Sequence, residues 1–123
     1  MADVFTLEDK RLSQIAHVAH EAYRAYCRTL DEFTKMPWQY APKWQHDITL
    51  SCVRYAIATP NSSPQQVHDH WLAVMYEAGW SYGADFNEAN HTHQYFLPYD
   101  KLPTKRRRKY ALMVAIVAAF MAG

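Results

Sequence analysis

The residues of this chain best suited to holding a ligand are its flat aromatic rings and its arginines. The candidates are Trp38, Trp44, Trp80, Tyr82, Tyr99, Arg24 and Arg54. Aromatic rings stack on nucleobases, and the planar guanidinium of arginine binds phosphate through two parallel hydrogen bonds. A pocket lined by both kinds of residue would suit a nucleotide-like molecule. The structural alternative is that the tryptophans fill the core of a small helical protein.

Two histidines join these candidate ligand-binding residues. His68 precedes Trp71 by three positions, so the two side chains share one face of a predicted helix. The His68 ring could line a ligand pocket; in the structural alternative Trp71 is a core residue and His68 binds a loop carbonyl. His93 lies in a loop with few regular hydrogen bonds, where its plainer role is to bond the backbone and hold the loop.

The sequence holds no recognisable catalytic motif. The segment from His20 to Arg24 begins like the zinc motif H-E-x-x-H but ends in arginine. The pairs His17/His20 and His91/His93 are spaced to share a metal, but the plainer readings are solvated or loop-holding histidines. With three glycines, the chain has neither a glycine-rich phosphate loop nor a G-x-S-x-G elbow. We therefore predict a non-enzymatic protein with no metal and no cofactor.

Five successive basic residues at 105–109 form the strongest charge run. On a helix they would cover every side, so some must turn inward or extend along the surface. Positive charge at the start of a helix also opposes the helix dipole. This cost is consistent with a role for the run, such as attracting an anionic ligand, an acidic partner or RNA. Nucleic acid is the less favoured partner, because the rest of the sequence is not basic.

The composition is typical of one globular domain. Of 123 residues, 50% are hydrophobic and 15% aromatic, and the formal charge of +1 gives no overall attraction for a polyanion. Cys27 and Cys52 fall within helical patterns and are expected to be buried, reduced thiols. The N-terminus lacks a signal-peptide layout, and the apolar stretch 111–121 is too short to span a bilayer. We expect a single domain over 1–123 that is cytoplasmic and does not contact a membrane.

The elements that must position the candidate residues are predicted to be helices. Apolar periodicity and end signals place them at residues 7–30, 42–59, 64–78 and from 103 into the apolar tail. The third helix has the clearest ends, because Ser63 and Gln66 form a capping box and Gly79 stands at the stop position. The predicted fold is mainly α, with a long ordered loop rich in aromatics and proline between the last two helices.

That loop carries the most specific pattern in the chain. It contains Gly79-Trp80-Ser81-Tyr82-Gly83, then Asp85 and His93, then Leu97-Pro98-Tyr99-Asp100-Lys101-Leu102-Pro103. Glycine and proline impose backbone angles that ordinary helices and strands do not use. We predict a packed loop over 79–103 with one short helical turn near 87–90. Loops held on a rigid scaffold are common binding sites.

Together with His68 and Trp71, this order and spacing resembles the ryanodine-receptor repeat, or RyR domain. The segments 20–27 and 38–44 resemble the single-repeat form found in bacteria and their viruses. The resemblance covers about residues 12–121 and is strongest over 36–121. The chain departs from the family pattern at Met75, Gln94 and Tyr110, where lysine, proline and an acidic residue are usual.

The resemblance implies several helices joined by an irregular loop. Ryanodine-receptor repeats pack in tandem pairs, so a lone repeat could form a homodimer instead. Stand-alone relatives are implied to recognise nucleotide-derived small molecules, as sensors of immune signals or as phage-encoded sponges acting in the host cytosol. The alternative is a protein-interaction module that acts through the basic start of the last helix and the aromatic loop.

Overall fold

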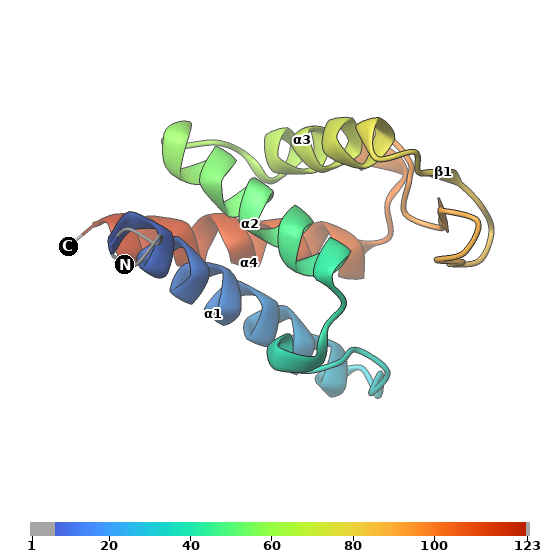
Figure 1. The fold of residues 1–123 in the computed structure, drawn as a ribbon, viewed down its shortest axis with the longest axis horizontal. Coiled ribbons are helices and arrows are strands. Elements are labelled where there is room, and N and C mark those ends of the chain that lie inside the picture. The colour runs from blue at the N-terminus through green and yellow to red at the C-terminus, as the bar shows by residue number, and fades with distance from the viewer. Residues whose placement is uncertain (1–6, 123) are drawn as a thin grey trace, which may run out of the picture.

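Most of the chain is helical in the computed structural model, which describes residues 7–122 (Figure 1). Its helices are α1 (Leu7–Thr29), α2 (Lys43–Ala58), α3 (Pro64–Glu77) and α4 (Thr104–Met121). Two short 3-10 helices, η1 (Trp38–Tyr40) and η2 (Tyr99–Lys101), precede α2 and α4. The prediction of a mainly α domain is confirmed, and the predicted helix bounds differ from the observed ones by at most one residue.

Helices α2 and α4 are central to the packing, because each of them contacts the other three helices. The first turn of α1 lies beside the last turn of α4, where Arg11 donates a hydrogen bond of 2.6 Å to the Phe120 carbonyl. The long loop extends from the opposite end of the helices (Figure 1). The largest fully buried side chains are Trp71, Tyr110, Ile15, His68, Val53, Val67 and Cys52.

The ends of α3 form as the sequence predicts. The Ser63 hydroxyl accepts a hydrogen bond from the Gln66 backbone N–H at 3.1 Å, and the Gln66 side chain accepts one from the Ser63 N–H at 2.8 Å. Gly79 follows the helix with a φ of 90°, in the left-handed region that favours glycine. These local signals fix the direction in which the chain enters the long loop.

The long loop contains a short parallel strand pair that the sequence did not predict. Strand β1 (Ser81–Tyr82) pairs with β2 (Thr92–His93). The backbone at Gly83 lies so close to Thr92 that an added Cβ would sit 2.6 Å from the Thr92 Cβ. The expected helical turn near 87–90 is wrong, because this segment forms a hydrogen-bonded turn after an antiparallel bridge between Asn87 and Thr92.

Both cysteines are buried and free, as predicted. Burial raises the pKa of the Cys52 thiol to about 12, so it stays protonated at neutral pH. Within residues 7–122, no helix combines the length and the apolar character that crossing a bilayer would require.

Candidate ligand-binding cavity

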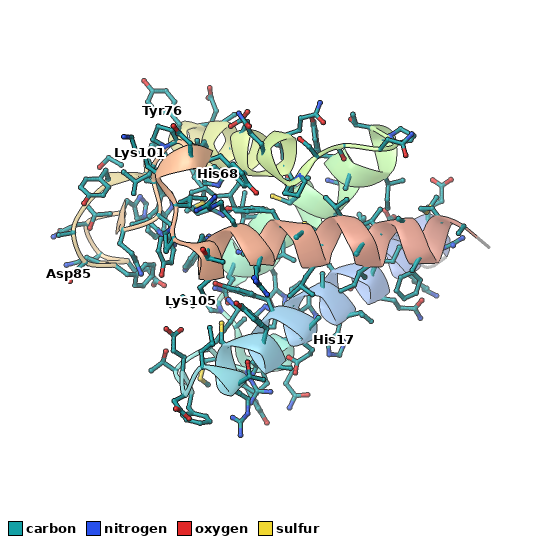
Figure 2. All side chains as sticks on the ribbon, turned by 180° about the vertical axis from the view of Figure 1, so that it is seen from behind. His17, His68, Tyr76, Asp85, Lys101 and Lys105 are labelled. Atoms are coloured by element: carbon teal, nitrogen blue, oxygen red, sulfur yellow. The ribbon has the colours of Figure 1, made fainter. Side chains whose placement is uncertain are left out.

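A cavity of about 280 Å³ lies where the start of α4 meets the end of α1, the beginning of α2 and the long loop. Its lining consists of Tyr23, Cys27, Glu32, Thr34, Lys35, Trp44, Gln45, Phe86, His93, Gln94, Tyr95, Lys105 and Arg106. Figure 2 shows Lys105 near the start of α4, between the long loop and α1. The cavity therefore draws its walls from segments that are far apart in the sequence.

Arg106 is the most unusual group in the lining. Its side chain is buried, with 5% of the residue exposed, and its guanidinium carbon lies 4.9 Å from the Tyr95 ring centroid and 5.1 Å from that of Trp71. Its Nε has no hydrogen-bond partner within residues 7–122. A buried donor left unpaired is costly, and arginine keeps its charge, so the position is suited to an anionic acceptor. The nearby Gln94 Oε1 is likewise buried and unpaired.

Three lysines crowd around Arg106. Burial, together with the charge of Arg106, lowers the pKa of Lys35 to about 8. The same two causes lower the pKa of Lys109 well below its ordinary value. Lys105 differs: burial disfavours its charge, but hydrogen bonds with Glu32 and Tyr95 raise its pKa overall. The cationic groups in this region repel one another, and an entering anion would relieve that repulsion.

Aromatic rings also line the cavity. The Trp44 and Phe86 rings stack with centroids 5.8 Å apart and planes inclined by 25°. The Trp44 indole N–H donates to Glu88 Oε1 at 2.7 Å, which fixes the orientation of the ring. The Tyr95 ring is close to the cationic groups, because its centroid lies 4.9 Å from the Arg106 guanidinium carbon and 5.9 Å from the Lys105 Nζ. An aromatic group and an anionic group can therefore be held side by side.

His93 is a buried, neutral part of the lining. Burial and then the positive charges of Arg106 and Lys109 lower its pKa to about 3. Its Nδ1 accepts a hydrogen bond of 3.0 Å from the Tyr95 backbone N–H, and its carbonyl accepts one from Gly83 at 3.3 Å. The prediction that His93 bonds the backbone and holds the loop is confirmed.

A family model for the RyR domain matches residues 40–122. The match spans about two thirds of the chain. The chain belongs to the RyR domain family. No curated protein matches it.

The two residues of the RyR motif H-x-x-W, His68 and Trp71, lie in the core of this domain. His68 is fully buried; its Nε2 donates to the Leu97 carbonyl at 2.6 Å, and its Nδ1 accepts from the Tyr110 hydroxyl at 2.8 Å. Burial lowers the pKa of His68, which keeps the ring neutral. Trp71 is a buried core residue. The structural alternative, in which Trp71 is a core residue and His68 binds a loop carbonyl, is therefore confirmed. The Tyr99 ring packs near His68, with ring centroids 6.2 Å apart.

Of the aromatic candidates in the RyR loop and before it, Trp44 lines the cavity and the others do not. Trp80 is buried one layer behind, with its ring centroid 4.9 Å from that of Trp44. Trp38 is buried and stacks on His46 at 3.9 Å between centroids. Tyr82 is 54% exposed and is not part of the lining. Trp38, Trp80 and Tyr82 therefore do not contribute to this cavity.

The two arginine candidates also lie outside the cavity lining. Arg24 forms an ion pair with Glu21 at 3.2 Å, and its Nε donates to the Lys35 carbonyl at 3.1 Å. It therefore positions Lys35 rather than facing the cavity itself. Arg54 is exposed on α2 and borders a different hollow, beside Arg11 near the start of α1.

The cavity contains residues that the sequence reasoning did not single out. These are chiefly Tyr23, Lys35, Phe86 and Tyr95, together with the specific pair Lys105 and Arg106 from the basic run. The run was the one signal available, since five basic residues at a helix start could not all face solvent. Among residues 7–122, no three histidine, cysteine or acidic side chains are grouped closely enough to hold a metal.

Proposed function

We propose that this RyR domain is a binding module for a nucleotide-derived small molecule, which enters the cavity at the start of α4. The observation that carries the proposal is the buried Arg106, whose Nε lacks a partner within the described chain while aromatic rings line the same cavity. Unpaired buried donors in a native protein call for an explanation, and an unbound ligand is one.

The cationic residues and the aromatic residues of the lining would bind different parts of the ligand. A phosphate would accept hydrogen bonds from the Arg106 Nε–H and from the ammonium groups of Lys35 and Lys105. A base would stack against Trp44 or Phe86, a contact that tolerates different bases because each has a flat face. His93 would stay neutral and keep the loop in place. RyR domains are non-catalytic repeats, so the proposed module binds its ligand without converting it.

Such a module would act in the cytoplasm, as a sensor of a bacterial immune signal or, if a phage encodes it, as a sponge that sequesters the signal in the host. Sequestration requires tight binding without turnover. Arg106, which keeps its charge at any physiological pH, supports retention of a phosphate. The sensor or sponge role requires that the ligand binds, so the binding experiments below test this role as well.

The second candidate function is a protein-interaction module, whose partner is another protein or a second copy of this chain. An exposed apolar hollow formed by Leu72, Tyr76, Phe96 and their neighbours favours it, since Tyr76 is 70% exposed. The exposed Arg108, in the basic start of α4, would add charge to such an interface. Large exposed aromatic residues are enriched at protein interfaces.

A thermal-shift screen with nucleotides, followed by calorimetry, tests the first candidate. A true ligand at 100 times its Kd stabilises the folded state by about 2.7 kcal/mol, which raises the unfolding temperature measurably. Trp44→Leu should weaken binding by about fivefold or more because it removes a stacking ring. Lys35→Ala should weaken it by about tenfold because it removes a charged donor.

The control variant is Lys43→Ala. Lys43 is a neighbour of Trp44 in the sequence, but its side chain is 86% exposed, pairs with Asp47 and is not part of the lining. Its removal should leave the affinity unchanged. Binding that both cavity variants leave intact would overturn the proposal. If no nucleotide raised the unfolding temperature and a protein partner bound stably, the second candidate function would be favoured.

A further inference from the structure

We infer that the cavity takes a phosphate group carrying two negative charges, a phosphomonoester or a diphosphate, and that this group displaces Glu32 from Lys105. A phosphodiester with a single charge would be the weaker ligand. The inference deepens the proposed function and rests on it for the nucleotide part of the ligand, but the anion site can be probed separately.

The charges of the lining set this requirement. Lys35, Lys105 and Arg106 are the cations, and Glu32 is the one carboxylate among the described residues that line the cavity. Their formal sum is two positive charges, which a phosphate dianion would neutralise. His93 adds no charge because its ring is neutral at physiological pH. In a partly buried site the attraction between opposite charges is several times stronger than in water, so a second negative charge contributes appreciably.

Glu32 already acts as an internal anion in this site. Its carboxylate forms an ion pair with the Lys105 ammonium, and the two side chains are 45% and 23% exposed. Lys105 therefore has a partner, whereas the Arg106 Nε beside it has none within residues 7–122. A phosphate in the cavity would supply the acceptor that Arg106 lacks and would compete with Glu32 for Lys105.

The backbone holds Glu32 at the edge of the cavity. At the end of α1, the Glu32 N–H donates to the Cys27 carbonyl at 3.0 Å and the Asp31 N–H donates to the Arg28 carbonyl at 3.1 Å. Asp31 has a φ of 61°. This is a Schellman motif, in which the residue after the left-handed position is tied back to the last turn of the helix. Glu32 thus repels a bound anion even after Lys105 has been released.

The size of the cavity limits what accompanies the phosphate. Its volume of about 280 Å³ is just below the usual range for small-molecule sites, about 300 to 1,000 Å³. One phosphate and one flat ring fit this space, whereas a second nucleotide unit would remain outside. The inferred ligand is therefore of mononucleotide size, or presents one such unit to the protein.

Calorimetry with three probes at pH 7.5 and low salt tests the inference: inorganic pyrophosphate, adenosine 5′-monophosphate and adenosine 3′,5′-cyclic monophosphate. The two nucleotides share base and sugar, but the monoester carries close to two charges at this pH because its second pKa is about 6. We expect the monoester to bind at least about tenfold more tightly than the cyclic diester. Equal or tighter binding of the cyclic compound would overturn the inference while supporting the proposed function.

Glu32→Gln supplies the second test. Removing the carboxylate should tighten binding of pyrophosphate and of the monoester by about three- to tenfold, and should help the cyclic diester less, because repulsion scales with ligand charge. The matched control is Glu77→Gln, which removes the same charge from an exposed position outside the lining and should change little. Weaker binding in Glu32→Gln would overturn the inference.

The pyrophosphate probe separates the two proposals. Binding of pyrophosphate that Lys35→Ala weakens, with neither nucleotide bound, would support the anion site and overturn the nucleotide module. Failure of all three probes to bind would overturn both.

Discussion

His68 joins three parts of the molecule through one imidazole. It lies on α3, bonds the long loop through the Leu97 carbonyl and bonds α4 through the Tyr110 hydroxyl. The family pattern usually has an acidic residue at position 110. A tyrosine there gives the His68 Nδ1 a neutral donor, and this suits an imidazole whose pKa is lowered by burial. The substitution therefore preserves a buried polar contact without adding a buried charge.

His68→Phe should destabilise the domain by about 2 to 4 kcal/mol, because it leaves the Leu97 carbonyl and the Tyr110 hydroxyl buried without partners. The measurement is urea unfolding followed by tryptophan fluorescence. In a Tyr110→Phe background, His68→Phe should cost about 1 kcal/mol less, because the Tyr110 hydroxyl that would lose its partner is already absent. Asp69→Asn, at the exposed neighbouring position, serves as the control. Equal costs in both backgrounds would contradict the predicted coupling.

The long loop acts as a structural element although it has little regular structure. Two backbone features hold it: the left-handed Gly79 at its start, and the close approach of Gly83 to Thr92 in the parallel pair. The first is a requirement on backbone angles and the second a requirement on space. The loop supplies Phe86, His93 and Tyr95 to the cavity, so the shape of the cavity depends on the order of the loop.

Gly83→Ala should cost about 1 to 3 kcal/mol, because the new Cβ overlaps the Thr92 side chain. The cost should be smaller in a Thr92→Gly background, where the overlapping atoms are absent. Gly79→Ala is the matched control: it is strained by its φ of 90°, while the nearest atom to its Cβ would be 3.6 Å away. Thermal unfolding of the single and double variants measures both effects. Rescue of Gly79→Ala by Thr92→Gly would contradict this explanation.

Helix α3 depends on its capping box, which also sets the direction of the chain entering it. Ser63→Ala should destabilise the domain by about 1 kcal/mol, because the Gln66 N–H loses its acceptor. Chemical denaturation gives the value. Ser13→Ala, at an exposed position within α1, should change stability by no more than about 0.5 kcal/mol. A comparable loss in both variants would argue against a role for the cap.

For the whole molecule, the buried histidines predict acid sensitivity. Burial lowers the pKa of His20 to about 4 and that of His93 to about 3, and it also lowers the pKa of His68. In the unfolded chain each would titrate near 6.5, so below that pH the unfolded state binds more protons than the folded state. The stabilisation is therefore complete above about pH 6.5 and is lost as the pH falls towards 4 and 3.

The free energy of unfolding should fall by at least about 1 kcal/mol per pH unit between pH 6.5 and 5. Urea titrations at pH 7, 6 and 5 measure the slope. His20→Gln should reduce the slope, since it removes one of the buried titrating rings, whereas His17→Gln removes an exposed ring and serves as the control. A free energy of unfolding that stays constant from pH 7 to 5 would contradict the prediction.

Much of the fold followed from local patterns. The apolar steps of α1, the capping box at Ser63 and Gln66 and the stop at Gly79 depend on contacts within a few residues, and such contacts can be read along the chain. The His68–Trp71 pair was also interpretable, because helical spacing places both side chains on one face. The pairing of β1 with β2 was not, since two-residue strands leave no period to detect.

The sequence by itself determined the helices, the family, and the fact that some of residues 105–109 must turn inward. Only the tertiary structure decided that Arg106 is the buried one, that Lys35 and Tyr95 meet it, and that Trp44 rather than Trp38 lines the cavity. The physical reason is that helix formation depends on neighbours along the chain. A cavity depends on the packing of distant segments, which no local spacing specifies.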